Sequence, residues 1–95
     1  MKIWKYPVDL TSIDRFELSI PSGASICHVE AQGCGVCLWA MVNPESDVET
    51  RTFSVYGTGY DIRPDLHQNY IGTFMINNQT ETFVGHVFEV TGMGA

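Results

Sequence analysis

The fold of this chain is indicated most clearly by residues 15–24, which read RFELSIPSGA. Phe16, Leu18 and Ile20 alternate with polar side chains, which is the pattern of a β-strand with one buried face and one wetted face. The Pro-Ser-Gly sequence that follows is typical of a tight turn. These residues therefore predict a strand that ends at a turn.

Six more stretches have the composition of short strands. They span residues 2–6, 25–31, 36–42, 50–56, 70–76 and 83–90. Most connections between them contain glycine, asparagine or proline, and no stretch has the apolar spacing of an amphipathic helix. A chain of 95 residues has room for one hydrophobic core. We therefore predict a single all-β domain over residues 1–95, built as a small antiparallel β-sandwich or barrel of about seven strands.

Two of these strands carry further information. The stretch 36–42, VCLWAMV, is apolar on both faces, so we expect it at the centre of a sandwich or at a contact between subunits. Because small domains leave much of their surface exposed, the second option predicts a homo-oligomer. In the stretch 25–31, strict alternation places Ile26 on the same face as His28 and opposite Val29.

Composition and charge restrict the class of protein. The chain carries five basic and eleven acidic residues, a formal net charge of −6. Its scattered lysines and arginines do not form the basic surface that nucleic acids require, so we expect no nucleic-acid partner. No stretch is apolar over the roughly 18 residues of a membrane helix, and the first residues lack the apolar centre of a signal peptide. Three cysteines, an odd number, do not suggest a secreted disulfide framework. We expect a cytoplasmic protein with no membrane partner.

The cysteines raise the question of a metal site. Cys34 and Cys37 form a C-x-x-C pair, and Cys27 with His28 would complete a zinc ligand set. A structural zinc site usually has a second such pair, which is missing here, and a cysteine in an apolar strand is usually a small buried hydrophobic residue. A redox C-x-x-C usually begins a helix, and none is expected here. We predict no cofactor, and leave open whether the three cysteines bind metal.

Glycine and proline mark the longest irregular part of the chain. Residues 57–59, GTG, are too short for a dinucleotide-binding loop and predict a tight turn or bulge. Residues 60–69 form the longest segment without a strand pattern, and a single 3₁₀ turn is expected at residues 64–66. Residues 91–95 are expected to be frayed.

Charged and histidine residues have simple structural interpretations. Glu45, Asp47 and Glu49 would share one face of an extended segment and could bind a cation or a basic partner, but a solvated loop is the simpler interpretation. His86 shares a strand face with Phe88, as a hydrogen-bonded core or interface histidine does. A cysteine–histidine pair for nucleophilic catalysis would meet in space rather than in sequence, and no motif identifies one.

Aromatic side chains are the main candidates for binding, because exposed aromatic residues contribute much of the affinity of protein interfaces. The aromatic set is Trp4, Tyr6, Trp39, Tyr56, Tyr60 and Tyr70, and many of these are expected to be core. We select the following residues as ligand- or partner-binding: Trp4, Tyr6, Arg51, Tyr56, Tyr60 and Arg63. No residue is predicted to be catalytic.

Several segments together resemble a family of short, functionally uncharacterised proteins from phage and bacterial genomes. The resemblance rests on residues 1–6 (MKIWKY), 20–24 (IPSGA), 37–44 (CLWAMVNP), 51–53 (RTF), 57–59 (GTG), 70–74 (YIGTF) and 86–89 (HVFE). It implies a compact β-domain and a place among phage accessory genes, and it brings no activity or catalytic residue with it. Cys37 fits the family pattern whereas Cys34 departs from it, which argues further against a C-x-x-C metal site.

These observations lead to a first hypothesis and three rivals. The first is a non-enzymatic phage accessory protein in the host cytoplasm, acting as a counter-defence factor by binding a host protein. A second is a homo-oligomeric sponge for a small nucleotide signal, with aromatic rings stacking on the base and Arg51 or Arg63 meeting phosphate. A third is a minor virion component. The fourth is a thiol or metal-dependent hydrolase that uses the cysteines and a histidine.

Overall fold

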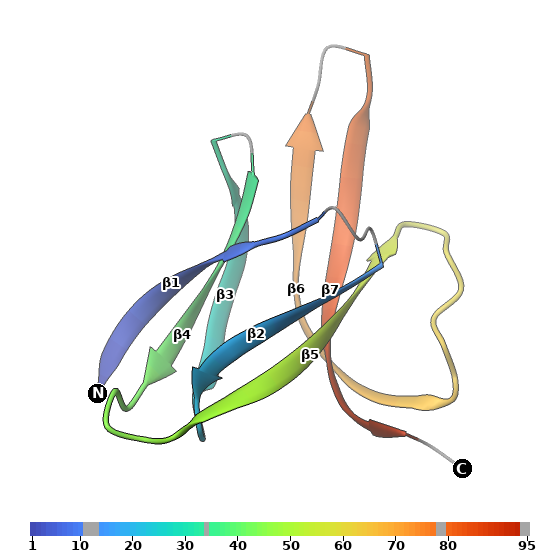
Figure 1. The fold of residues 1–95 in the computed structure, drawn as a ribbon. Coiled ribbons are helices and arrows are strands. Elements are labelled where there is room, and N and C mark those ends of the chain that lie inside the picture. Colours follow the sequence, from blue (N-terminus) through green and yellow to red (C-terminus); the bar gives the residue numbers. More distant parts are fainter. Residues whose placement is uncertain (11–13, 34, 78–79, 94–95) are drawn as a thin grey trace.

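The computed structural model describes residues 1–10, 14–33, 35–77 and 80–93, which form seven strands (Figure 1). The strands are β1 (Lys2–Val8), β2 (Arg15–Pro21), β3 (Ser25–Gln32), β4 (Gly35–Val42), β5 (Val48–Gly57), β6 (Leu66–Asn77) and β7 (Thr82–Met93). All pairings between them are antiparallel. The predicted all-β fold is confirmed, and each predicted strand has a counterpart.

The strands form two sheets that face each other. One sheet has the order β1-β4-β3 and the other has the order β2-β5-β7-β6. The chain changes sheet between β1 and β2, between β2 and β3, and between β4 and β5, so neighbours in sequence are often in different sheets (Figure 1). The architecture is therefore a small β-sandwich.

The core consists of the inward-pointing residues of both sheets. The three-stranded sheet contributes Val29, Val36, Leu38, Ala40 and Val42, and the four-stranded sheet contributes Phe16, Ile20, Phe53, Val55, Phe74 and Val87. Phe16 and Phe53 are cross-strand partners whose rings stack with centroids 4.9 Å apart. Such pairs stabilise a sheet beyond the apolar area that they bury. The alternation in residues 15–20 is confirmed, because Phe16 and Ile20 are buried and Leu18 packs against the core.

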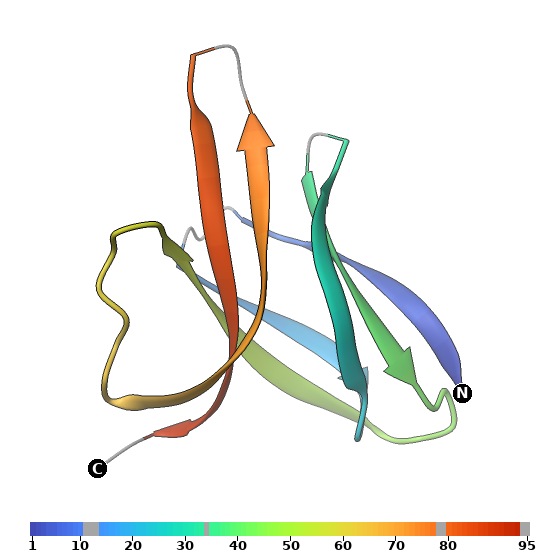
Figure 2. The same cartoon turned by 180° about the vertical axis from the view of Figure 1, so that it is seen from behind.

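Two glycines allow close packing around β6. A Cβ atom at Gly72 would lie 2.8 Å from Val29 Cγ1, so this glycine permits β3 and β6 to approach each other. Both views place these two strands side by side (Figure 2). At Gly85, the partner of Phe74 across the β6–β7 pair, the Phe74 ring occupies the space that a side chain would fill. Gly85 therefore leaves space for the Phe74 ring, and Gly72 leaves space for β3 to pack closely against β6.

Three local predictions were wrong. A β-bulge between Ile26 and His28 adds a residue to β3, so Ile26 packs against the core on the same side as Val29. Strand β6 begins at Leu66 and β7 continues to Met93, because each pairs with the other along its length. Residues 64–65 form a turn rather than a 3₁₀ segment.

Candidate functional site

The loop between β5 and β6 begins with a tight turn at residues 57–60. The amide of Tyr60 donates a hydrogen bond to the carbonyl of Gly57 at 3.0 Å, and Gly59 has a φ of +88°, a conformation that favours glycine. The Tyr60 ring rests on Gly57, where an added Cβ would lie 3.2 Å from Tyr60 Cε1. The predicted turn is thus confirmed, and its glycines fix the position of an aromatic ring.

Hydrogen bonds from Tyr56 and Gln68 hold this loop against the outer face of the four-stranded sheet. The Tyr56 hydroxyl donates to Gln68 Oε1 at 2.9 Å and accepts from the Arg63 amide at 3.3 Å. Gln68 Nε2 in turn donates to the carbonyl of Arg63 at 3.4 Å. The loop runs on the side of the sandwich that faces away from the three-stranded sheet (Figure 2). Side chains from β5 and β6 therefore hold its middle in place.

A hollow of about 270 Å³ lies between this loop and the sheet, and we call it the loop hollow. It is lined by Tyr56, Gly57, Thr58, Gly59, Tyr60, Ile62, Tyr70, His86 and Phe88. Tyr60 is 70% exposed and Tyr70 is 59% exposed. The Phe88 ring meets the Tyr70 ring nearly edge-on with centroids 5.4 Å apart. The hollow therefore has an aromatic base and two exposed tyrosines on its walls.

A chain of hydrogen bonds crosses the sheet beneath the hollow. Thr58 Oγ1 is 2.7 Å from His86 Nε2, and His86 Nδ1 is 2.9 Å from Thr73 Oγ1. Thr73 Oγ1 is in turn 2.5 Å from the Tyr70 hydroxyl. Both imidazole nitrogens are bonded to neutral hydroxyl groups, so His86 joins the turn of the loop to Tyr70. This arrangement orients the side chains of the hollow.

Two charged groups of the loop, Arg63 and Asp65, form an ion pair. Arg63 donates from Nε to Asp65 Oδ1 at 3.0 Å and from Nη2 to Asp65 Oδ2 at 2.5 Å. The hydrogen bond to Asp65 raises the pKa of Arg63, and the same bond lowers the pKa of Asp65. The guanidinium group that could meet an anion here already has a carboxylate partner.

Tyr60 also borders three neighbouring hollows. An apolar one of about 430 Å³ is lined by Leu10, Val55 and Phe83 among others, and one of about 250 Å³ contains Arg63. A fourth hollow, of about 190 Å³, continues along Thr82 to Val84. A larger depression of about 660 Å³ lies away from Tyr60, beside Asp9, Arg15, Phe16 and Glu17, and three of these four residues are charged. Tyr60 is therefore the residue around which the concave surface is organised.

Residues 1–94 match a domain of unknown function, DUF7352. The chain belongs to this family. Neither the curated proteins nor the solved structures gave a match. Membership of DUF7352 agrees with the expectation of an uncharacterised family, and it assigns no activity to any residue.

In this DUF7352 domain, three of the six selected residues come together. Tyr56, Tyr60 and Arg63 surround the hollow of about 250 Å³ that adjoins the loop hollow. Trp4 and Tyr6 lie on β1, in the other sheet. Trp4 is 39% exposed, whereas Tyr6 packs against the core. The Tyr6 hydroxyl is buried with no hydrogen-bond partner among the described residues, and burial raises the pKa of this phenol.

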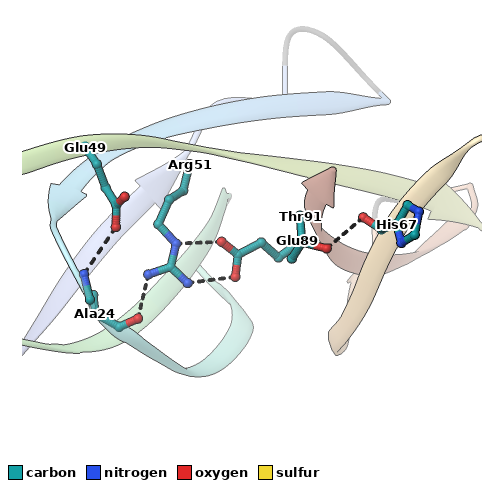
Figure 3. A network of polar contacts seen from close by, with 7 residues as sticks. Ala24, Glu49, Arg51, His67, Glu89 and Thr91 are labelled. Atoms are coloured by element: carbon teal, nitrogen blue, oxygen red, sulfur yellow. Dashed lines mark hydrogen bonds and ion pairs between the residues drawn. The ribbon is translucent and has the colours of Figure 1, made fainter. Parts of the chain in front are cut away.

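Arg51, the sixth residue, does not line the loop hollow and lies between Glu89 and the turn at Ala24 (Figure 3). It forms an ion pair with Glu89 and donates from Nη1 to the carbonyl of Ala24 at 2.5 Å. The hydrogen bonds to Glu89 raise the pKa of Arg51, and only 18% of its side chain is exposed. Arg51 therefore joins β5 and β7 to the turn between β2 and β3.

Besides its two glycines, the loop hollow contains four residues that the sequence did not identify as site residues: Thr58, Ile62, His86 and Phe88. Tyr70 was considered among the aromatics but not selected. One sequence signal could have identified two of them. Side-chain alternation places His86 and Phe88 on the same face of one strand, so they are neighbours on its outer side. That strand is brought beside Tyr60 only through pairing between β5 and β7.

Among the described residues, no three His, Cys, Asp or Glu side chains gather closely enough to hold a metal ion. Cys34 lies outside the described residues, so the C-x-x-C pair has no geometry to report. Glu49, one of the three spaced acids, accepts a hydrogen bond from the Gly23 amide (Figure 3). Within the described ranges there is no helix of the length and apolarity that crossing a membrane requires.

Proposed function

We propose that this chain is a non-enzymatic binding protein that receives a side chain of a partner protein in the loop hollow. The observation that supports this proposal is the exposure of Tyr60 and Tyr70, at 70% and 59%, on the walls of one hollow. Tyrosine is enriched at binding hot spots because its large, rigid ring gives contact area at low cost in conformational entropy. The hydrogen bonds of Tyr56 support the loop, so less ordering is needed on binding.

The size of the hollow favours a side chain over a nucleotide. Pockets for small molecules usually have volumes of about 300–1,000 Å³, and the loop hollow has about 270 Å³. An aromatic or branched aliphatic side chain suits a space of this size and its lining of rings. The neighbouring hollows around Tyr60 would then take up the residues that flank the inserted side chain.

The resemblance to phage accessory proteins suggests what the partner is. An accessory protein without catalytic machinery acts by occupying a surface of another protein, so the proposed partner is a host protein of a defence system. A nucleotide sponge has less support. Its two expected phosphate ligands, Arg51 and Arg63, are engaged by Glu89 and Asp65, and releasing either would leave a carboxylate next to the phosphate.

The proposal is tested by site-specific crosslinking in the cells that make the protein. A photoreactive phenylalanine derivative replaces Tyr60, and a matched control carries it at Val48, which is 67% exposed on β5 far from the loop. We expect one defined host-protein adduct from position 60 and not from position 48. The adduct should be lost when Tyr70→Ala is added. Identical products from both positions, or an adduct that survives Tyr70→Ala, would refute the proposal.

Affinity measurements with the identified partner give a second test. Tyr60→Ala should weaken binding roughly 30-fold, the effect of a typical hot-spot residue. Val48→Ala should leave the affinity unchanged.

A further inference from the structure

The outer face of the β1-β4-β3 sheet is apolar along its centre, and we call it the β4 face. The register places Ile3 opposite Met41, Lys5 opposite Trp39 and Pro7 opposite Cys37, all on the side away from the core. On the other side of β4 the face continues with Ser25, His28, Glu30 and Gln32 of β3. Ile3 is 62% exposed and Met41 is 39% exposed. The strand that the sequence marks as apolar on both faces thus has one face in the core and one uncovered.

The charge on the β4 face differs from that of the whole molecule. The chain has eleven acidic residues and a net charge of −6, yet Glu30 is the one acidic residue that the strands place on this face. Lys5 lies on the same face, and His28 lies 3.6 Å from the Glu30 carboxylate. Two copies of an acidic protein repel each other least where their surfaces carry balanced charge. The β4 face is such a surface.

The two strands that carry Lys5 and Glu30 lie on opposite edges of the face. Lys5 is on β1 and Glu30 is on β3, with β4 between them. A two-fold axis parallel to β4 would place β1 of each copy over β3 of the other. Lys5 of each copy would then lie level with His28 of the other, and its long side chain would extend two residues along β3 to reach Glu30. Trp39 and Met41 would lie beside the axis and pack against the same residues of the second copy.

We propose that two copies of this chain pair through the β4 face, around a two-fold axis that runs along β4. In such an isologous interface the same surface patch of each copy forms the contact. Sheets that pack face to face bury interdigitating apolar side chains. Lys5 now donates to Gln32 Oε1 at 3.0 Å across β4. Because this contact is exposed, exchanging it for the carboxylate of a second copy requires little desolvation. The pairing is independent of the proposed binding function.

Pairing through the β4 face would leave both loop hollows accessible. The loop hollow is lined by residues of β5, β6, β7 and the β5–β6 loop. This loop lies on the side of the sandwich away from the three-stranded sheet (Figure 2). The dimer would therefore present two hollows facing in opposite directions and could hold two partner molecules, or a partner that is itself oligomeric, with increased avidity.

Sedimentation equilibrium of the full chain over a wide range of concentration tests this pairing. The variant Met41→Glu places a carboxylate beside the axis, and Met75→Glu is a matched control, because Met75 is exposed on the other sheet. We expect dimers from the unchanged chain and from Met75→Glu, and monomers from Met41→Glu. A chain that is monomeric throughout, or a dimer that Met41→Glu leaves intact, would overturn the proposal.

A charge exchange tests the orientation of the axis. Lys5→Glu would place two carboxylates together at each edge and should weaken the dimer, and adding Glu30→Lys should restore it. If β1 lay over β1 instead, Lys5→Glu would leave like charges facing each other as before. An unchanged dimer in the Lys5→Glu variant would therefore overturn the arrangement along β4.

Discussion

Arg51 and Glu89 form a two-point ion pair across β5 and β7, with Nε 2.5 Å from Oε2 and Nη2 2.7 Å from Oε1. The side chains are 18% and 13% exposed. The third bond of the guanidinium group, to the carbonyl of Ala24, reaches the turn where the chain passes from one sheet to the other. This geometry connects the four-stranded sheet to the turn that leads into the three-stranded sheet.

We expect Glu89→Gln to lower the free energy of unfolding by about 1–3 kcal/mol, because the half-buried guanidinium loses its charged partner. Urea denaturation at neutral pH measures this loss. The matched control is Glu17→Gln, at an exposed carboxylate that accepts a hydrogen bond from Thr52 and lies outside both proposed binding surfaces, and its stability should be nearly unchanged. Equal losses in the two variants would show that the Arg51 pair has no special structural role.

Gly85→Ala should destabilise the sandwich by about 1–3 kcal/mol, the usual result of overpacking a core. The added Cβ would clash with the Phe74 ring at Cζ, and Phe74 is buried and has little room to move. Gly92→Ala on the same strand is the control, because nothing lies within 4 Å of its added Cβ. Thermal unfolding should also show that Phe74→Leu recovers part of the loss in the Gly85→Ala background. If Gly92→Ala cost as much as Gly85→Ala, the contact with Phe74 would not be the cause.

Tyr56→Phe should loosen the β5–β6 loop without unfolding the domain. The change removes the hydroxyl that donates to Gln68 and accepts from the Arg63 amide, and such a loss costs about 1 kcal/mol. Hydrogen exchange of the Arg63 amide should accelerate, while that of the core amide at Val87 should change little. Unchanged exchange at Arg63 would mean that the loop is held by other contacts.

The Asp65 carboxyl should titrate below its ordinary pKa, because Arg63 donates hydrogen bonds to the ionised form. A pKa that is lower in the folded state stabilises the fold above the unfolded-state pKa. That stabilisation is lost as the pH falls through the folded-state pKa. NMR titration of the side-chain carboxyl measures the shift, and Arg63→Gln should return the pKa toward its ordinary value. A titration curve that Arg63→Gln does not alter would contradict this assignment.

The candidate site was recovered in part from the sequence. Tyr56, Tyr60 and Arg63 were selected together and do lie together, because they belong to one stretch of chain whose turn is visible in the glycines. The aromatic and histidine residues of β6 and β7 were not selected, because nothing local shows which strand pairs with β5. Arg51 was selected as a binding residue for the same reason. Its partner Glu89 is 38 residues away in sequence, so nothing local shows that Arg51 is engaged in an ion pair.

What the sequence by itself determined is the class of fold, the approximate extent of the strands and most of the residues that point inward. These depend on the two-residue alternation of side chains and on turn residues, both of which are local. What only the tertiary structure decided is the strand order, the bulge that turns Ile26 toward the core, and the gathering of Tyr60, Tyr70 and His86 around one hollow. These depend on pairing between distant segments, and many pairings satisfy the same alternation. Packing both sheets around one core selects among them.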